Sequence, residues 1–557
     1  MKILIIGCGL AGLSAAITAA REGSTAILLS PLPPERAESV LAAGGINAAL
    51  NTKGQDDSWQ QHYLDTMKAG VDLADEAAVR NLTEHAPELI RELAADGVAF
   101  NRDDAGNPDL RYFGGEKKMR TVYAKAGIGK QLISGLTAIA GRYEAEGRIK
   151  RMLRQKFLRV VLAEGHFAGI IAEDTDSGTL SYVPADVLII GSGGLSGLFQ
   201  KTTGSCVSSG SVSASLFVSG IEMGNLEMIQ YHPTTFETPQ KRILISEAAR
   251  GEGGRLFTVR DGKRWYFMED WYGKDGNLMP RDVVSQSIYR VCHDMKLGLD
   301  GKDQVGLDLT FLSDEIVHER LKEITDITQT YLGLDPKKEI LPVYPGIHYF
   351  MGGILTDRNH RTSIPGIYAA GGCACIYHGA NRLGGNSTLG AIFGGKTAAQ
   401  TAAADGQKEK LTRESRRDAA KSGEALLREL RSNVGTGTER SGAILADIQD
   451  VMSRYMGIVR SADELDEGIR LLSEMENRSP YFAARNISDA LAVQDFRLLG
   501  LAMLQSALFR RESRGSQVRA DYPERDDIHF KVTCAAQLRD GNISVRKEEI
   551  GRIFDAG

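Results

Sequence analysis

The stretch Lys2-Ile-Leu-Ile-Ile-Gly-Cys-Gly-Leu-Ala-Gly12 decides the fold, together with the small-residue run Leu13–Ala20 that follows it. An apolar strand, a GxGxxG loop and a helix stand here in the order that a dinucleotide-binding site requires. Gly7 would form the tight turn, Gly9 would admit a pyrophosphate to the backbone, and Gly12 would let the helix pack against the strand. This context favours a binding site over a bare glycine turn and predicts a Rossmann-like α/β domain.

Further glycine clusters indicate where a dinucleotide would lie. The next strand, Ala26–Leu29, ends in serine where an acidic residue usually holds a ribose hydroxyl, so we expect the adenosine end to be bound differently. A second glycine loop spans residues 42–50, and a third follows the strand Val187–Ile190. Glycines let a ligand approach bare backbone. The candidate cofactor-binding residues in these segments are Ser30, Ala43, Gly44, Gly45 and Gly193.

The segment His378-Gly-Ala-Asn-Arg-Leu-Gly-Gly-Asn-Ser387 precedes a helix that we predict over roughly residues 388–404. Unpaired N–H groups at a helix start favour negative charge. Arg382 adds a planar fork of donors that suits a carboxylate. The segment could therefore hold both an electron-rich ring edge and an anionic substrate. Taken alone, it fits a glycine-rich turn with a surface arginine equally well.

Composition restricts the class of protein. The 557 residues are 42% hydrophobic and 25% charged, which is ordinary for a soluble globular chain, and the net charge of −5 gives no basic footprint for nucleic acid. None of the six cysteines stands in a metal-type CxxC pair, which indicates a reduced compartment. Cys373 and Cys375 are expected to be core thiols rather than a redox pair. Without an apolar run of about 18 residues or a signal peptide, we expect a cytoplasmic, multi-domain protein.

The character of the sequence changes along the chain and suggests its domains. We predict a nucleotide domain over residues 1–225 and 345–406, interrupted by an inserted domain over 226–344. A helical domain over 407–520 and a C-terminal segment over 521–557 follow. Eight apolar residues between Ile444 and Val459 recur at helical spacing and should form the core of the helical domain. The charged tail from Arg511 to Asp527 is most simply a solvated surface, although it could also form part of a partner surface.

These motifs, in this order, resemble the flavoprotein subunit of succinate dehydrogenase and fumarate reductase. The resemblance rests on HPTT from His232, SEAARGEGG from Ser246, PRDVV from Pro280, HYFMGG from His348, HGANRLGGNS from His378, and RESRG and DYPERDD in the tail. It implies an α/β FAD-binding domain of the Rossmann-like, glutathione-reductase type. An inserted α+β capping domain, a helical domain and a short C-terminal segment would complete the fold.

The resemblance also implies roles for individual residues. A dicarboxylate would be held by His232, Ser246, His348 and Arg382, with Phe113 beside it, because a buried dianion needs donors from several segments. Arg281 would give a proton to the substrate carbon, and Glu247 and Arg250 would replace it. Spacing of three places Glu247 and Arg250 on one helical face, although a purely structural ion pair fits the sequence equally well. Around the flavin, the resemblance adds Asn386, Ser387 and Leu389.

The sequence departs from the family at several flavin positions. Glu38 stands where membrane-bound members carry the histidine that tethers FAD, so we expect FAD to be bound without a covalent link. Such a loss would favour fumarate reduction over succinate oxidation. Ala43, Gly372 and the segment Gly210-Ser-Val212 also replace residues that are usual near the flavin. These changes leave the predicted fold unaffected but bear on flavin affinity and potential.

The expected reaction is reduction of fumarate to succinate, or its reverse, by hydride transfer at flavin N5. L-aspartate oxidase resembles this chain but differs where Phe113 and Gly384-Gly385 stand, and Phe113 could not meet a substrate amine. An enoate reductase for a different acid and a non-catalytic FAD module would also fit these motifs. Residues 246–395 resemble most the Gram-positive and epsilon-type branch. That implies an iron–sulfur subunit, a possible membrane anchor, and a position in the cytoplasm or on the inner face of the membrane.

Overall fold

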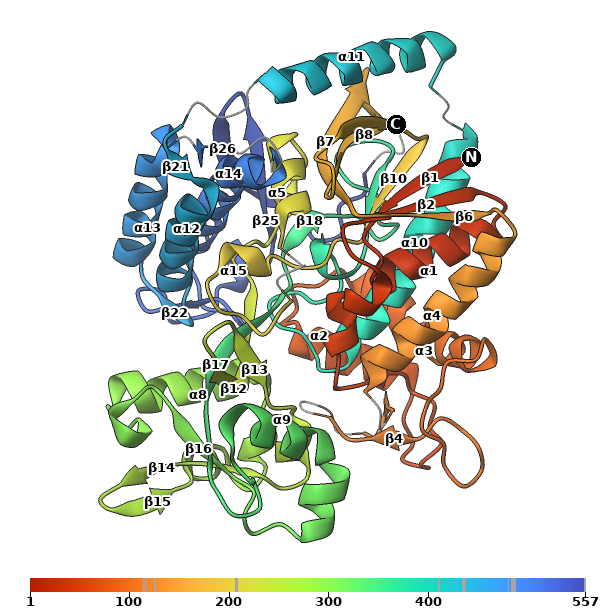
Figure 1. Ribbon diagram of the computed structural model, residues 1–557. Coiled ribbons are helices and arrows are strands. Elements are labelled where there is room, and N and C mark those ends of the chain that lie inside the picture. The colour runs from red at the N-terminus through yellow and green to blue at the C-terminus, as the bar shows by residue number, and fades with distance from the viewer. Residues whose placement is uncertain are drawn as a thin grey trace.

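The chain folds into a nucleotide-binding domain, an inserted domain, a bundle of helices and a C-terminal hairpin (Figure 1). This is a computed structural model, which describes residues 1–113, 116, 118–124, 127–205, 209–408, 411–432, 437–478, 480–481 and 487–554. The motif Phe113-Gly-Gly115 is typical of a tight turn, but its two glycines lie outside the described residues.

A five-stranded parallel sheet forms the centre of the nucleotide-binding domain. Its strand order is β19-β10-β1-β2-β6, with Ile5 of β1 paired to Ile189 of β10 and to Leu28 of β2. Helices α1, α4 and α10 pack together beside the sheet, and the antiparallel strands β7, β8 and β9 form a separate three-stranded sheet. The sheet strands are β1 (Lys2–Ile6), β2 (Thr25–Ser30), β6 (Ile149–Leu153), β10 (Val187–Ile190) and β19 (Ile367–Ala369); the helices are α1 (Leu10–Arg21), α4 (Ile128–Ala145) and α10 (Asn386–Lys408).

The first glycine loop adopts the conformation that its sequence predicts. Gly7 has a φ of 100°, and a Cβ placed on it would come within 2.4 Å of the Gly191 carbonyl oxygen. A Cβ on Gly12 would lie 1.9 Å from the Gly7 carbonyl oxygen, so only glycine lets α1 pack this closely against the turn. The Rossmann-like expectation for this domain is confirmed.

Residues 56–100 contain two helices, α2 (Trp59–Ala69) and α3 (Glu76–Ala95). Ser58 and Asp75 cap them by accepting hydrogen bonds from backbone N–H groups of their first turns. The loop that precedes α2 contains β3 (Ile46–Asn47), which pairs with β5 (Thr121–Val122) and, through it, with β4 (Leu110–Arg111). The separate three-stranded antiparallel sheet consists of β7 (Gln155–Ala163), β8 (His166–Asp174) and β9 (Leu180–Pro184).

The inserted domain has its own sheet and its own apolar core. Two long strands, β12 (Ile229–Glu237) and β17 (Leu341–Phe350), carry the chain between the domains and pair with each other. Phe236, Phe267 and Val343 belong to a core cluster separate from that of the nucleotide domain. The remaining elements are β13 (Arg242–Leu244), β14 (Arg255–Arg260), β15 (Lys263–Trp265), β16 (Val305–Asp308), α6 (Ala248–Gly251), α7 (Phe267–Tyr272), α8 (Arg281–Tyr289) and α9 (Lys322–Leu332).

Three helices form the bundle on the left of Figure 1: α12 (Ser441–Tyr455), α13 (Ala462–Glu474) and α14 (Ile487–Phe509). The predicted apolar stripe is confirmed at its centre, because Ile444, Ile448 and Met452 have no exposed surface. Helix α11 (Arg413–Ser432) was expected to belong with this bundle. It lies instead across β7, β8 and β9, and Leu426, Leu427 and Leu430 pack there against strand residues.

The C-terminal segment completes a second sheet. The hairpin β25 (Thr533–Arg539) and β26 (Asn542–Glu548) extends a sheet of order β20-β18-β11-β25-β26. Its other strands are β11 (Met223–Gly224), β18 (Gly353–Leu355) and β20 (Ala374–Cys375). Two further pairs form separate two-stranded sheets: β21 (Glu439–Arg440) with β23 (Pro480–Tyr481), and β22 (Val459–Arg460) with β24 (Val518–Arg519). A short helix, α15 (Asp527–Phe530), precedes the hairpin.

The expectation of a solvated charged tail is wrong for its first half. Glu512, Arg514 and Arg519 are buried, with 0%, 2% and 1% of their surface exposed. Glu512 accepts hydrogen bonds from Arg510 and Arg514, so the charges are buried as pairs. From residue 521 to 525 the tail is exposed as predicted.

Five cysteines of the described chain, Cys373 and Cys375 among them, are free and buried, as expected for core thiols. Among the described helices, none is long and apolar enough to cross a membrane. No cluster of three or more potential metal-binding side chains occurs within the described residues.

Candidate active site

A cluster of buried charges lies where the inserted domain meets the nucleotide domain. Glu247 is the N-cap of the short helix α6, and Arg281 is the first residue of α8. The Arg281 Nε and Nη2 atoms donate to the two Glu247 carboxylate oxygens at 3.0 and 2.9 Å. Arg250 Nη2 donates to the same carboxylate at 3.2 Å, and its Nη1 donates to the Asn277 carbonyl oxygen at 2.5 Å. Hydrogen bonds thus connect the three predicted proton-relay residues, Arg281, Glu247 and Arg250.

Burial would raise the pKa of the Glu247 carboxyl, but the neighbouring Arg281 and Arg250 outweigh that effect and lower it to about 2. The carboxylate is therefore ionised at every physiological pH. Burial lowers the pKa of the Arg250 guanidinium, which makes its proton easier to release than that of an exposed arginine.

Gln230 joins the relay to Arg382 and was missed by the sequence reasoning. Its Oε1 atom accepts hydrogen bonds from Arg281 Nη1 at 2.9 Å and from Arg382 Nη2 at 3.1 Å. Its amide nitrogen donates to the Asn381 side chain and to the Arg382 carbonyl oxygen. The available signal was its position two residues before His232 on a strand, since alternate strand residues share a face.

Arg382 has only 4% of its surface exposed, and its guanidinium lies 4.5 Å above the ring of Tyr349. Burial, helped by the nearby charge of Arg281, lowers its pKa to about 9, so it remains a cation at neutral pH. Its Nε atom is buried without a hydrogen-bond partner among the described residues, and the same is true of Arg250 Nε. Unpartnered buried donors are costly and are expected where a ligand binds.

The two predicted histidine ligands face this cluster from neighbouring strands. The rings of His232 and His348 lie 5.4 Å apart in an edge-to-face arrangement. His348 is the extra residue of a β-bulge, because Gln230 pairs with Tyr349 and Tyr231 with Ile347. Such a bulge redirects a side chain.

Burial and the surrounding arginines lower the pKa of both histidines well below its ordinary value, so both rings are neutral. The backbone N–H of Thr234 donates to His232 Nδ1, which leaves Nε2 of that ring with the proton. The Ser246 hydroxyl, the fourth predicted ligand, accepts a hydrogen bond from the Ala248 N–H at the start of α6.

Phe113 fills the space between two glycine loops. A Cβ on Gly44 would lie 2.6 Å from its ring, and one on Gly384 would lie 2.3 Å from the ring and 3.1 Å from Glu247 Oε2. Phe113 therefore borders both the charged cluster and the loop of residues 42–50, which we call the flavin loop. Its apolar ring offers no partner to an amino group.

The flavin loop is tied to the start of α10. The Thr388 hydroxyl donates to the Gly45 carbonyl oxygen at 2.8 Å, and the Asn47 side chain donates to Gly384 O and Asn386 Oδ1. Asn386 and Ser387 are the first residues of α10, whereas the side chain of Leu389 is buried in the apolar core. Arg111 supports the loop from the other side by donating to the carbonyl oxygens of Ala43 and Gly44.

The residues present fit a flavin dinucleotide. The turns at Gly7, Gly191–Gly194 and Gly371–Gly372 converge, since a Cβ on Gly372 would meet Gly194 N at 3.4 Å and one on Gly7 would meet Gly191. Gly193, with a φ of 80°, lies in this convergence. Side chains at these positions would fill the space beside the turns, whereas glycines leave the backbone accessible to a cofactor. Ser30 is buried at the end of β2, where its hydroxyl donates to the Leu32 carbonyl oxygen.

Glu38, at the predicted tether position, lies near the segment 204–205. Its Oε1 atom accepts a hydrogen bond from the Ser205 N–H at 3.3 Å, and a Cβ on Gly204 would lie 2.7 Å from it. The segment Gly210-Ser-Val212, also singled out from the sequence, forms the N-cap and first turn of α5 (Ser211–Val218).

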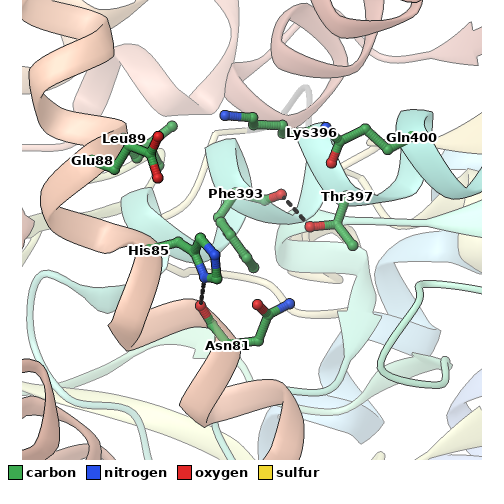
Figure 2. A pocket seen from close by; sticks show the side chains of 8 residues that line it. All are labelled: Asn81, His85, Glu88, Leu89, Phe393, Lys396, Thr397 and Gln400. Carbon is green, nitrogen blue, oxygen red and sulfur yellow. Dashed lines mark hydrogen bonds between the residues drawn. The ribbon is translucent and has the colours of Figure 1, made fainter.

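A surface pocket of about 260 Å³ lies apart from this cluster, between α3 and α10 (Figure 2). The His85 ring stacks near Phe393, and Lys396 pairs with Glu92. None of the predicted site residues lines this pocket.

Comparison with known proteins agrees with this geometry. Residues 2–388 match the family model of the FAD binding domain, and residues 445–552 match that of the fumarate reductase flavoprotein C-terminus. The chain is 37% identical to the succinate dehydrogenase flavoprotein subunit of Bacillus subtilis over 96% of this chain and 94% of that one. It is 33% identical to the fumarate reductase flavoprotein subunit of Mycobacterium tuberculosis over 98% of this chain and 96% of that one. A structure of E. coli quinol fumarate reductase superimposes with a TM-score of 0.90 at 28% identity, covering 99% of this chain and 97% of that chain.

Proposed function

The chain belongs to the family of succinate dehydrogenase and fumarate reductase flavoprotein subunits, and we propose that it reduces fumarate to succinate, or catalyses the reverse, with FAD as redox cofactor. The observation that carries this proposal is the charge of the buried cluster. Arg250, Arg281 and Arg382 oppose the single carboxylate of Glu247, and both neighbouring histidines are neutral. Two excess positive charges in a buried site suit a dicarboxylate dianion.

The carboxylates of the substrate would be bound by Arg382, whose Nε is free to donate, and by the N–H groups of His232 and His348. Gln230 sets the distance between Arg382 of this clamp and Arg281, because its side-chain oxygen accepts hydrogen bonds from both arginines. Phe113 lies against the flavin loop and excludes water from the reacting face.

When bound, FAD supplies hydride to one alkene carbon in the reductive direction and accepts it in the oxidative direction. Arg281 gives a proton to the other carbon. Glu247 passes a proton to Arg281 from Arg250, to which it is hydrogen-bonded. Most of the acceleration would come from positioning and from electrostatic polarisation of the clamped substrate.

The test is anaerobic. The flavin of the purified protein is reduced with dithionite, excess reductant is removed, fumarate is added, and the oxidised-flavin absorption band is followed. Rapid return of the band is expected. Return only with a different unsaturated acid would indicate another enoate reductase. Reduction of the oxidised protein by L-aspartate but not by succinate would indicate an aspartate oxidase, and no response to any acid would indicate a non-catalytic module.

We further propose that FAD is held without a covalent bond, because the Glu38 carboxylate replaces the histidine that forms the tether in related enzymes. Acid precipitation should then release all FAD into the supernatant, and the variant Glu38→His provides the comparison. Flavin that stays with the precipitated wild-type protein would contradict this proposal.

The redox partner is proposed to be an iron–sulfur subunit, with the assembly peripheral on the inner face of the membrane. Support comes from the relatives, which are named as flavoprotein subunits of succinate dehydrogenase and fumarate reductase. Co-purification of the tagged chain with an iron-containing protein would test it.

A further inference from the structure

Glu116 is a carboxyl group beside the flavin loop that the proposed mechanism does not use. The residue as a whole is partly exposed, but its carboxyl group is enclosed. Oε1 lies 2.6 Å from Asn47 Nδ2, and Oε2 lies 3.1 Å from the Thr121 hydroxyl. Asn47 and Thr121 have no exposed surface. Glu116 thus contacts the flavin loop through strand residues that pair β3 with β5.

The hydrogen atoms available to the contacts of Glu116, Thr121 and Asn47 can be counted. The Thr121 hydroxyl has one hydrogen and lies 2.7 Å from Asn47 Oδ1, a group that can only accept. If Thr121 donates there, its contact with Glu116 needs a hydrogen on the carboxyl group. Protonated Glu116 would donate to Thr121 and accept from Asn47 Nδ2, so both close contacts of Glu116 and both close contacts of Thr121 would be satisfied.

The hydrogen bonds of the neighbouring residues Gly384, Asn386 and His62 are consistent with this count. The second hydrogen of Asn47 Nδ2 is shared by the Gly384 carbonyl oxygen at 2.7 Å and Asn386 Oδ1 at 2.9 Å. His62 Nε2, 3.0 Å from Asn386 Oδ1, supplies the hydrogen that Asn386 accepts. Burial and the charge of Arg120 lower the His62 pKa to about 3, so this ring is neutral and adds no charge.

The charges around Glu116 also disfavour its ionised form. Among the described residues, the charged groups that act on it are Arg120, Asp57 and Asp65. Arg120 has no exposed surface and pairs with both aspartates, at 2.9 Å to Asp57 and 2.8 Å to Asp65. This trio already has one excess negative charge. Burial, reinforced by both aspartates and only partly offset by Arg120, raises the pKa of Glu116 well above its ordinary value.

We propose that Glu116 is a positioning residue: as a neutral carboxylic acid it holds Asn47, and with it the flavin loop, against the start of α10. The inference rests on the proposed FAD site. A neutral Glu116 also leaves the positive end of α10 free to stabilise the negative charge of a reduced ring. If ionised, it would place a second uncompensated negative charge beside that ring and lower the flavin potential.

The variant Glu116→Gln separates these states, because an amide reproduces the hydrogen bonds of the protonated acid and cannot ionise. The midpoint potential of the bound flavin is measured by dye-coupled reductive titration of the holoprotein from pH 6 to 9. The two proteins should have equal potentials at pH 6. As the pH rises through the raised pKa of Glu116, the wild-type potential should fall below that of the variant. In Asp65→Asn, which removes one of the negative charges that keep Glu116 protonated, this fall should begin at lower pH.

Thermal unfolding gives a second readout that does not need FAD. The folded state keeps a proton that the unfolded state loses above a pH of about 4.3. Wild-type stability relative to Glu116→Gln is therefore greatest below that pH, and it decreases as the pH rises towards the raised pKa of the folded state.

Two results would overturn the inference. Potentials that already differ at pH 6 would mean that Glu116 is ionised in the wild type. Parallel curves of both potential and unfolding temperature would mean that its protonation is not coupled to the site. Failure of fumarate to reoxidise the wild-type flavin would instead refute the proposed reaction and leave both measurements on Glu116 interpretable.

Discussion

Two buried clusters of arginine and glutamate in the described part of the chain differ in how completely their charges are paired. In the active-site cluster, Glu247 is shared by Arg250 and Arg281, with Arg382 beside them. The second cluster joins the tail to the nucleotide domain: Arg510 pairs with Glu227 and Glu512, and Arg514 pairs with Glu512, all without exposed side-chain surface. We call this second group the tail cluster.

The tail cluster is neutral and its donors are used. Two arginines oppose two glutamates, and every nitrogen of the Arg510 guanidinium donates to a described acceptor, including Asn225 Oδ1 and the carbonyl oxygens of Phe530 and Val532. In the active-site cluster, Arg250 Nε and Arg382 Nε have no described partner, and two positive charges remain. Burial of charge alone therefore does not identify a binding site; the active-site cluster combines buried charge with an excess of positive charge and unpartnered donors.

Neutralising one arginine in each cluster gives the most direct test of this difference. Arg281→Gln should lower turnover by about 10²- to 10⁴-fold, the usual contribution of a general acid, while the flavin stays bound. Steady-state fumarate reduction and the flavin absorption spectrum measure the two quantities. A variant that retains more than a tenth of wild-type turnover would show that Arg281 is not the proton donor.

Arg510→Met should act on stability instead. Removing one partner leaves Glu227 and Glu512 buried with less compensation, which should cost about 3–5 kcal/mol of unfolding free energy. Denaturant unfolding measures the loss, and turnover per bound flavin should stay near that of the wild type. A selective loss of turnover without a loss of stability would assign the tail cluster a catalytic role.

Gln230→Leu should give an intermediate effect. The substitution removes the acceptor that Arg281 and Arg382 share, and hydrogen bonds to charged groups contribute about 1.5–3 kcal/mol each. We expect kcat/KM to fall by about 10- to 100-fold. The matched control is Gln286→Leu, whose amide donates to the Gly515 carbonyl oxygen rather than to a residue of the cluster. Equal losses in both variants would indicate a general packing defect.

The smallest effect is expected at Asp282, which accepts a hydrogen bond from Asn381 across the domain boundary. Burial raises the pKa of its carboxyl to about 6. The folded state therefore binds a proton that the unfolded state loses above a pH of about 3.9, and stability decreases as the pH rises from there to about 6.

Asp282→Asn should remove this dependence, so its stability relative to the wild type should increase between pH 4 and 6 and stay constant above pH 6. Thermal unfolding measured from pH 4 to 8 checks the prediction. A constant difference between the two proteins over that range would show that Asp282 titrates normally.

Local motifs were sufficient to predict the elements whose residues are consecutive. The run Lys2–Gly12 predicts strand, turn and helix because each property depends only on near neighbours. The apolar stripe around Ile448 predicts a buried helix face for the same reason. The expected pairing of Glu247 with Arg250 follows from spacing within one short helix.

Contacts between distant segments were not predictable in this way. Gln230 was missed because its importance depends on two arginines that lie 51 and 152 residues further along the chain. Helix α11 was assigned to the wrong neighbours because an amphipathic pattern shows that a face is buried but not what covers it. The tail was expected to be solvated because the partner of Arg510, Glu227, is 283 residues away.

The order of residues was therefore enough to predict the Rossmann-like domain, and the family resemblance proposed the residues of a dicarboxylate site. Which buried charges are balanced became evident only in the folded molecule, since that balance is a sum over side chains from separate segments. The same holds for Glu116, whose protonation depends on Asn47, Thr121 and Arg120 together. Desolvation and Coulomb energies act through space, and chain order does not record them.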